Sequence, residues 1–332
     1  MLGFVLRRLA AMAAVLFVLA TVLFFLLHLS PDSPVNSLAP SVAASPAAKA
    51  AFLHRYGLDR SLWVQYVDYL GDTATGRFGR SIFDGSSVWG DVAGHLPVSI
   101  ELGLSAGLLA VVPGVAFGAW LASAGGRAVD VAGRVLTVVA LSVPSYWLAV
   151  VLMVLLGSRL PALFPQVGGY VPFTEDPAAN LEGIVLPAVL VALPAFALVA
   201  RSARVAVAEV LASDYVAFAR GMGMTDRQVL WRVGLRNALV PVLTVMGVVV
   251  AGMMAGAVLV EDVFGIPGIG NLLVGAFGRK DYPLALGATL VTALIFLVLN
   301  LLVDVGCRLA DPRTARDRAP VGPGHLGGVA PA

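Results

Sequence analysis

SDYVAFARGMGMTDRQVLWRVGLRNALVP, residues 213–241, is the longest amphipathic interruption in a sequence that otherwise consists mostly of apolar runs of membrane-spanning length. Ser213 is a suitable N-cap, and Asp214 suits the positive first turn of a helix. The apolar positions that follow recur at i, i+3, i+4 and i+7, the spacing of one helical face; they are Tyr215, Phe218, Ala219 and Met222. Gly223 can adopt the left-handed conformation that ends a helix. The stretch therefore predicts a short helix with one apolar face, ending at a glycine.

A second helix is predicted directly after this glycine. Thr225 and Gln228 have the Thr-x-x-Gln spacing of a capping box. Pro241 marks the return to apolar sequence, so we expect residues 208–238 to form a loop that contains two short helices. The alternative is a solvated surface loop without a partner. However, burying each large apolar side chain of the first helix in a partner would contribute about 1.5–3 kcal/mol, and a solvated loop favours polar residues at such positions.

Composition places the chain among membrane proteins. Of its 332 residues, 59% are hydrophobic and 13% are charged, whereas soluble domains carry about 25% charged residues. The net charge of +2 shows no nucleic-acid footprint. The single cysteine, Cys307, excludes an intrachain disulfide and a multi-cysteine metal site. Neither of the two lysines, Lys49 and Lys280, follows a glycine-rich loop, so the chain has no P-loop for ATP.

The N-terminal region predicts a retained membrane helix. Residues 1–8 form a basic head, and residues 9–29 are long enough to cross a bilayer core of about 30 Å. A cleaved signal peptide is the competing interpretation, but its apolar region would be about 7–15 residues long. Arg7 and Arg8 place the N-terminus inside.

The rest of the chain predicts an external segment and five further spans. Residues 30–97 are polar, with helix predicted over 47–70, and residues 98–311 hold the five-helix core. The predicted spans of this core lie near residues 98–122, 135–157, 184–207, 239–260 and 284–307. The sequence therefore predicts an all-α integral membrane protein with six transmembrane helices. Residues 312–332, rich in Arg, Pro and Gly, are expected to be a disordered cytoplasmic tail.

The distribution of basic residues predicts the orientation. Alternation from an inside N-terminus puts both termini and residues 208–238 in the cytoplasm. The two short outer loops hold only Arg159, Arg279 and Lys280, whereas most arginines fall on the other side. This asymmetry is the one expected from the positive-inside rule.

Motifs that could carry bond chemistry do not fit their surroundings. The Gly-x-Ser-x-Gly pattern at residues 103–107 lies inside a predicted span, where helix packing explains it better than a nucleophile elbow. Gly-x-x-x-Gly spacings also occur at 114/118 and 252/256. The four histidines lack metal-ligand spacing. Of the few ionisable residues in the spans, Glu101 and Asp304 are predicted near helix ends, which argues against a proton-coupled transporter or an intramembrane enzyme.

The same loop resembles a known family. Asp214-Tyr215-Val216, Ala219-Arg220, Gly223, Arg236-Asn237-Ala238 and Pro241 are similar to the cytoplasmic "EAA" loop of permease subunits of ABC importers of the dipeptide, oligopeptide and nickel type. Departures from the general motif are Ala217 in place of its glutamate, Phe218 in place of its first alanine and Arg236 in place of its proline. The resemblance implies that the helix docks on an ATPase subunit. The implied coupling residues are Asp214, Tyr215, Phe218, Ala219, Arg220, Met222 and Gly223.

A second signature lies in the external stretch 261–270, followed by residues 281–283. The resemblance implies the type I ABC-importer (MetI-like) permease fold in a bacterial inner membrane, with a tight turn beside a short helix in this stretch. It also implies an external gate or binding-protein contact formed by Glu261, Phe264, Pro267, Gly268 and Asp281. The implied partners are a second permease subunit in a hetero- or homodimer, two ATPase subunits that hold ATP and Mg²⁺, and an extracytoplasmic binding protein. This chain is expected to bind no cofactor or metal and to do no bond chemistry of its own.

The substrate predicted from the resemblance is a di- or oligopeptide. Nickel, glutathione or another small solute is the alternative, and a membrane scaffold or intramembrane enzyme is the alternative from a different class. Polar groups expected along the substrate path are Ser142, Ser145, Tyr146 and Asn300.

Overall fold

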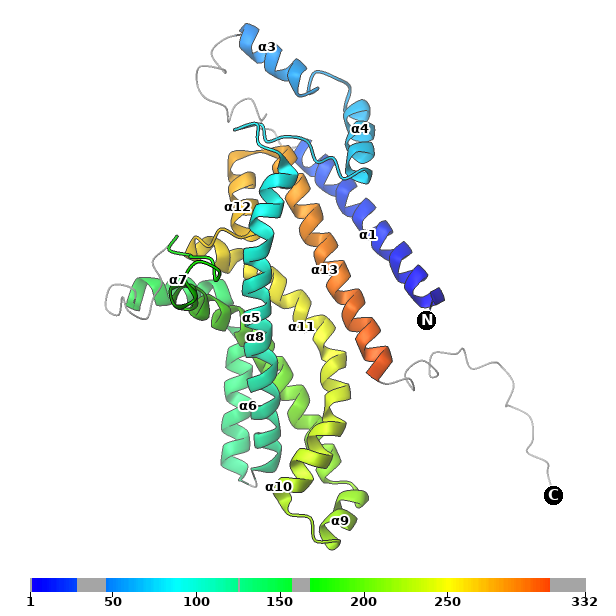
Figure 1. Cartoon of the computed structure of the whole chain (residues 1–332), viewed down its shortest axis with the longest axis vertical. Coiled ribbons are helices and arrows are strands. Elements are labelled where there is room, and N and C mark those ends of the chain that lie inside the picture. Colours follow the sequence, from blue (N-terminus) through cyan, green and yellow to red (C-terminus); the bar gives the residue numbers. More distant parts are fainter. Residues whose placement is uncertain (1, 29–45, 125, 157–167, 311–332) are drawn as a thin grey trace, which may run out of the picture.

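The structure is a computed structural model that describes residues 2–28, 46–124, 126–156 and 168–310 (Figure 1). Within these ranges the regular elements are helices, apart from an isolated β-bridge between Arg80 and Ser87. The N-terminal helices are α1 (Leu2–His28), α3 (Pro46–Arg55), α4 (Leu62–Ala74), α5 (Val88–Ser123), α6 (Arg127–Ser142) and α7 (Ser145–Leu156). They are followed by α8 (Pro177–Leu211), α9 (Asp214–Gly221), α10 (Asp226–Gln228), the π-helix η2 (Val229–Gly234), α11 (Leu235–Phe264), α12 (Ile269–Arg279) and α13 (Tyr282–Ala310). The predicted all-α class is confirmed.

Four uninterrupted helices are long and apolar enough to cross a membrane, namely α1, α5, α8 and α13. Two helix pairs, α6 with α7 and the second half of α11 with α12, pass the same test but are bent by 91° and 72°. Counting each bent pair as one span gives six, the predicted number. By length and composition, therefore, the described helices can supply all six spans.

The bend between α6 and α7 lies inside the predicted span near residues 135–157, at Pro144, a residue expected to bend or end a helix. Pro144 lacks a backbone N–H, and its ring disfavours the helical conformation of the residue before it. Val143 accordingly has extended angles (φ −89°, ψ 119°), and the chain turns there. Proline alone does not end a helix in this fold, because Pro113, Pro187 and Pro194 lie inside α5 and α8.

The centre of the molecule is the contact of α5 with α8, against which α11 packs (Figure 1). Small residues allow this close approach: a Cβ at Gly118 would overlap the carbonyl oxygen of Ala200, and one at Gly114 would lie 3.0 Å from Val199. The other predicted glycine pairs do not pack in this way. A Cβ at residue 103, 252 or 256 would meet nothing within 4 Å among the described residues. Among the described residues, therefore, the 114/118 pair is the one of the three at which both glycines allow a close helix contact.

The start of α5 and the external helix before it differ from their predicted positions, whereas the end of α5 at Ser123 agrees with the prediction. The helix begins at Val88, ahead of the predicted start at residue 98, because Ser87 caps it and accepts a hydrogen bond from the amide of Gly90. The external helix predicted over 47–70 is interrupted at Gly57, whose φ of +67° requires glycine, and so becomes α3 and α4. The described part of the external segment, from residue 46, therefore consists of two helices and a loop that leads directly into a long span.

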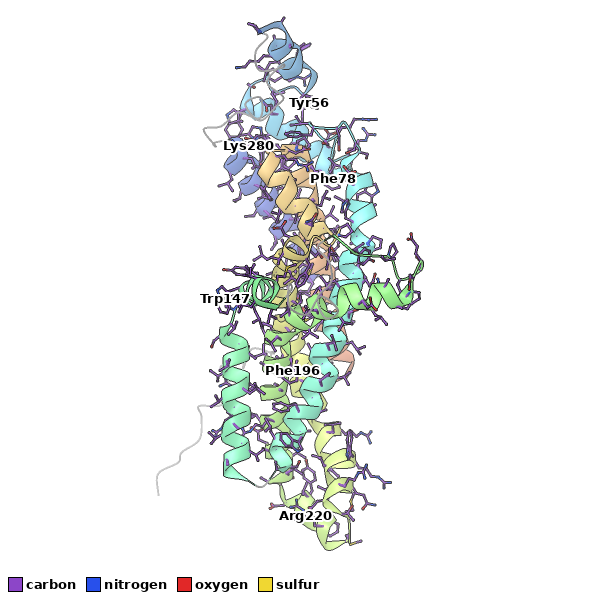
Figure 2. All side chains as sticks on the ribbon, turned by 90° about the vertical axis from the view of Figure 1, so that its left-hand side faces the viewer. Tyr56, Phe78, Trp147, Phe196, Arg220 and Lys280 are labelled. Atoms are coloured by element: carbon purple, nitrogen blue, oxygen red, sulfur yellow. The ribbon has the colours of Figure 1, made fainter. Side chains whose placement is uncertain are left out.

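The amphipathic stretch also folds differently in its second half. Instead of a separate short helix, α10, η2 and α11 form one continuous helical segment from Asp226 to Phe264, and Pro241 lies within it. Leu230 and Leu235 pack with Val207 of α8, which explains why the segment stays helical as it enters the membrane core. The stretch thus contains one separate short helix, α9, followed by the start of a span. Figure 2 places Arg220 of α9 at one end of the molecule and Tyr56 and Lys280 at the opposite end.

Candidate coupling surface and external residues

Helix α9 is built by the local signals at its two ends, although one of them differs from the prediction. The predicted side-chain cap at Ser213 is wrong: its hydroxyl donates to the carbonyl of Val210 (2.5 Å) and accepts no bond from α9. The predicted stop is confirmed. Gly223 has φ +88°, and its amide donates to the carbonyl of Arg220 (2.9 Å). Arg220 also pairs with Asp226 (3.0 Å), joining the end of α9 to the helix that follows.

The capping box after α9 is confirmed. The Thr225 hydroxyl accepts from the amide of Gln228 (3.3 Å), and the Gln228 side chain accepts from the amide of Thr225 (3.0 Å). This reciprocal pair starts the segment that becomes α11. The left-handed glycine and the capping box together fix the turn between α9 and the membrane helix.

Helix α9 has an inward and an outward apolar side. Val216 is fully buried and faces the chain, and α9 packs against η2. The predicted apolar face points outward: Tyr215, Phe218 and Met222 are 50%, 71% and 74% exposed. Large exposed apolar side chains grouped on one short helix indicate a docking surface for another protein. We call these three residues the α9 face.

An ion-pair network that the sequence did not predict joins α6 to α8, the helix that precedes α9. Arg204 of α8 and Arg134 of α6 both contact the carboxylate of Asp130, at 2.5 and 3.1 Å. Only Ala212 and Ser213 separate α8 from α9. The network therefore holds α6 against the helix that leads directly into α9. The sequence signal for this network was Asp130, an acidic residue between Arg127 and Arg134. The spacing could not show that its second partner, Arg204, comes from α8.

The external signature residues form a buried scaffold at the opposite end. Glu261, 1% exposed, accepts from the hydroxyl of Ser99 (2.7 Å) and from the amide of Gly270 (2.6 Å). The Ser99 hydroxyl in turn accepts from the amide of Ile269 (2.8 Å). Glu261 and Ser99 thus cap the first turn of α12, whose orphan amides would otherwise be unsatisfied. The turn before α12 contains Gly265 at φ +63°.

Asp281 is a second buried cap, only 2% exposed. Its carboxylate accepts from the Ser81 hydroxyl (2.6 Å), from the Ile82 amide (3.2 Å) and from the Leu284 amide (3.4 Å). One side chain therefore joins the external loop before α5 to the first turn of α13. This contact links residues about 200 positions apart in the chain.

These placements limit which of the predicted gate or binding-protein residues lie at the surface, and a role of these residues in an external gate stays a prediction. Glu261, Phe264, Gly268 and Asp281 are buried, and only Pro267 is exposed. In this structure the four buried residues cannot touch an external protein directly, because they hold the turn and the helix starts beneath the surface. The predicted tight turn beside a short helix is nevertheless present.

Comparison with known proteins agrees with this architecture. A family model described as "Binding-protein-dependent transport system inner membrane component" matches residues 114–316, and a model of the N-terminal part of the same membrane components matches residues 1–103. The chain belongs to this family. It is a permease subunit of an ABC importer and a multi-pass inner-membrane protein, it works with an ATPase and a substrate-binding protein, and it is not an enzyme itself.

Curated relatives cover almost the whole permease. "Di/tripeptide transport system permease protein DppB" of Pseudomonas aeruginosa is 34% identical over 96% of this chain and 100% of its own length. "Dipeptide transport system permease protein DppB" of Lactococcus lactis is 34% identical over 94% of this chain and 99% of its own. The Bacillus subtilis protein of the same name is 33% identical over 94% and 98%.

The polar residues predicted along the substrate path lie in two places in the permease. Ser142, Ser145 and Tyr146 gather at the bend between α6 and α7, where Ser145 is buried and the other two are exposed. Asn300 lies on α13, which packs against α1, α5, α11 and α12, and its amide donates to the carbonyl of Phe296 (3.1 Å). The predicted polar residues thus lie on separate elements, and their role along a substrate path stays a prediction.

Glu101 corrects another expectation. Because α5 begins at Val88, Glu101 lies well inside the helix and not near its end. Its carboxylate accepts a hydrogen bond from the hydroxyl of Tyr170 (2.6 Å). Burial, together with this carboxylate, raises the pKa of the Tyr170 phenol well above its ordinary value. An ionisable residue inside a span was the signal for this pair, since such residues need a partner.

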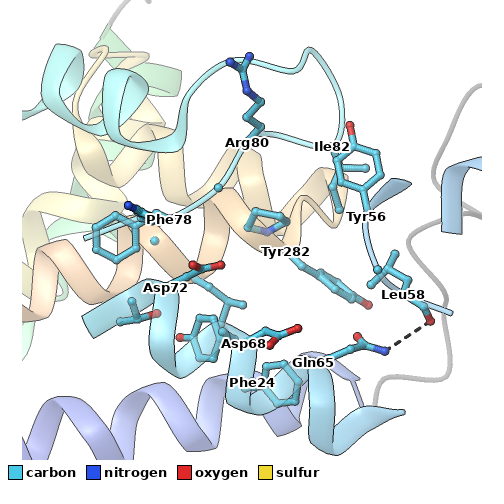
Figure 3. Close-up of a pocket in the computed structure, with 18 of the residues that line it drawn as sticks. Phe24, Tyr56, Leu58, Gln65, Asp68, Asp72, Phe78, Arg80, Ile82 and Tyr282 are labelled. Atoms are coloured by element: carbon cyan, nitrogen blue, oxygen red, sulfur yellow. Dashed lines mark hydrogen bonds between the residues drawn. The ribbon is translucent and has the colours of Figure 1, made fainter. Parts of the chain in front are cut away.

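The permease also has a cavity of about 440 Å³ between α1, α4, the loop before α5 and the start of α13 (Figure 3). Figure 3 shows the side chains of Asp68, Asp72, Gln65 and Tyr282 around it, and the Gln65 amide donates to the carbonyl of Leu58 (3.4 Å). Tyr69 lies on the same side of α4, where burial raises the pKa of its phenol to about 12. No cluster of three or more potential metal-binding His, Cys, Asp or Glu side chains occurs in the described part of the chain.

Proposed function

We propose that this chain is one of the two permease subunits of an importer of short peptides and that the α9 face is the surface on which an ATPase subunit acts. The observation that carries this proposal is the outward exposure of Tyr215, Phe218 and Met222 on a short helix between two membrane helices. Val216 seats the same helix on its own chain. A force applied to the α9 face would pass through two linking residues into α8 and through the turn at Gly223 into α11.

The proposed orientation places both termini and residues 208–238 in the cytoplasm. The arginine distribution supports this orientation. The ion pair between Arg8 of α1 and Asp304 of α13 (2.5 Å) supports only the placement of both termini on the same side. A Cys307→Ala background leaves no other cysteine. In this background, Asp226→Cys should react with a membrane-impermeant maleimide only in inverted vesicles. Labelling of that cysteine from outside intact cells would contradict the orientation.

The proposed assembly contains a second, similar permease subunit, identical or different, two ATPase subunits and an extracytoplasmic binding protein. ATP and Mg²⁺ would be held by the ATPase subunits, because this chain has no P-loop. Closure of the ATPase pair on ATP would move the α9 face and shift the permease from inward-facing to outward-facing. In this proposal, the chain alone hydrolyses no ATP.

The proposed substrate is a di- or oligopeptide, in line with the names of the relatives. Ser142 and Tyr146, both exposed at the bend between α6 and α7, are proposed to offer polar contacts to it. The test is uptake of a radiolabelled dipeptide into vesicles that contain the assembled transporter, its binding protein and internal ATP. We expect uptake that stops when ATP is omitted and that excess unlabelled dipeptide competes away. Uptake of nickel or glutathione without peptide uptake would reject the peptide substrate while leaving the permease role intact.

A further inference from the structure

Helix α4 has one side that nothing in the described chain covers. Trp63 and Val67, one turn apart, are 68% and 64% exposed, and Leu62 and Val64 are exposed as well. The carboxylates of Asp68 and Asp72 lie instead on the side of the cavity in Figure 3. We propose that α4 is an interfacial helix whose exposed apolar side inserts between the lipid headgroups and acyl chains at the C-terminal end of α1.

The position of α4 along α1 sets its depth. At about 1.5 Å per residue, the 27 residues of α1 span about 40 Å, which matches a bilayer together with its headgroup regions. The hydroxyls of Thr21 and Tyr66 lie 2.7 Å apart. Thr21 precedes the end of α1 by seven residues, or about 10 Å along the helix axis. Helix α4 therefore reaches down to the level of the last two turns of a membrane span and does not stand clear of the bilayer.

Aromatic contacts fix this position. The ring of Phe24 lies 5.4 Å from those of both Tyr66 and Tyr69, and the ring of Phe25 packs edge-on against Trp63 at 6.0 Å. Tryptophan and tyrosine are enriched where a membrane protein crosses from acyl chains to headgroups, because their rings are apolar and their edges can hydrogen-bond. A cluster of one tryptophan and two tyrosines at the end of α1 has this composition.

The lipid is favoured as the occupant because the exposed side of α4 continues the lipid-facing surface of α1. Val22 and Leu26 of α1 are exposed and, by length and composition, belong to a membrane span. They lie beside Phe25, which touches Trp63. At 100° per residue, Trp63 and Val67 lie about 40° apart on α4, whereas Val67 and Asp72 lie about 140° apart. The helix thus separates an apolar side from an acidic side, as interfacial helices do.

Nitroxide spin labels measure this directly. In the full chain with Cys307→Ala, Val67→Cys is labelled and reconstituted into vesicles of phosphatidylethanolamine and phosphatidylglycerol. Asp72→Cys, on the acidic side of the same helix, is the matched control. Collision rates with oxygen, which concentrates in acyl chains, are compared with those of a water-soluble nickel chelate. We expect oxygen to dominate at residue 67 and the nickel chelate at residue 72.

Each other outcome contradicts the proposal. Equal dominance of the nickel chelate at both positions would mean that the exposed side of α4 is solvated. Low collision rates for both reagents at residue 67 would mean that protein covers it. Loss of the oxygen signal on adding the binding protein to the assembled transporter would instead identify a protein-docking surface. Val64→Cys, at a position that is 43% exposed and takes no part in the aromatic cluster, provides a second labelling position in case Val67→Cys lowers the amount of protein in the membrane.

Discussion

Replacing Phe218 by aspartate should separate the permease from its ATPase without unfolding it. Phe218 is 71% exposed in the isolated chain and touches no buried core, so the free permease loses little when the ring is removed. Val216, which holds α9 in place, remains unchanged. The effect should therefore appear when the two proteins associate and not in the folding of the permease.

The expected loss can be worked out from the burial of this one side chain. Burying an exposed phenylalanine contributes about 1.5–3 kcal/mol, of which roughly 1–2 kcal/mol is available to a ring that is already partly covered. An unpaired carboxylate left in the same groove would add a penalty of about 1–3 kcal/mol. Together these amount to roughly 2–5 kcal/mol, a weakening of about 30-fold to several thousandfold, since 1.4 kcal/mol corresponds to tenfold.

The measurement is the affinity of the purified ATPase subunit for the permease in nanodiscs, alongside permease abundance in membranes. Ala217→Asp adds the same charge at the neighbouring exposed position, outside the α9 face, and should bind almost normally. Phe218→Leu keeps an apolar side chain and should weaken binding by less than about tenfold. If Phe218→Asp binds the ATPase as tightly as wild type at normal abundance, the α9 face is not the docking surface.

Three further substitutions test other parts of the structure. Gly223→Val adds a Cβ at φ +88°, where the conformational cost is about 1–2 kcal/mol although no atom lies within 4 Å of that Cβ, and should reduce ATP-driven uptake. Gly221→Ala, two residues earlier and without positive φ, should leave uptake intact. Equal uptake by both variants would contradict the role of the turn. Gly118→Val should lower the amount of folded permease recovered, because even its Cβ would overlap α8. Gly103→Val should lower recovery much less, because a Cβ at residue 103 meets no described atom within 4 Å. Equal recovery of the two would refute the close contact of α5 with α8. Asp281→Ala leaves a buried hydroxyl and two amides without their acceptor, at a cost of about 1–3 kcal/mol for each buried group. The variant should therefore speed tryptic cleavage of the external segment in right-side-out vesicles. Unchanged cleavage would show that this carboxylate does not hold the loop.

The local features of the coupling helix could be predicted because they depend on residues a few positions apart. The apolar spacing from Tyr215 to Met222 defines one side of α9, the positive φ of Gly223 ends it, and the capping box at Thr225 starts the next segment. The cap at Ser213 was predicted by the same kind of rule and is wrong, because its hydroxyl bonds back to α8 instead. Local sequence rules state which hydrogen-bond partners a side chain can reach, but not which of these partners it binds in the folded chain.

The sequence by itself determined the membrane class, the number of apolar runs and the amphipathic helix between two of them, since composition and periodicity are properties of consecutive residues. Tertiary structure decided which residues are buried. Glu261 and Asp281 look like surface residues of a Gly- and Pro-rich loop. However, Glu261 is buried and accepts a hydrogen bond from Ser99, 162 positions away, and Asp281 is buried and accepts one from Ser81, 200 positions away. Likewise, only the packing of α5 on α8 distinguishes Gly118 from Gly103. A buried carboxylate needs partners that the chain brings together only after it has folded.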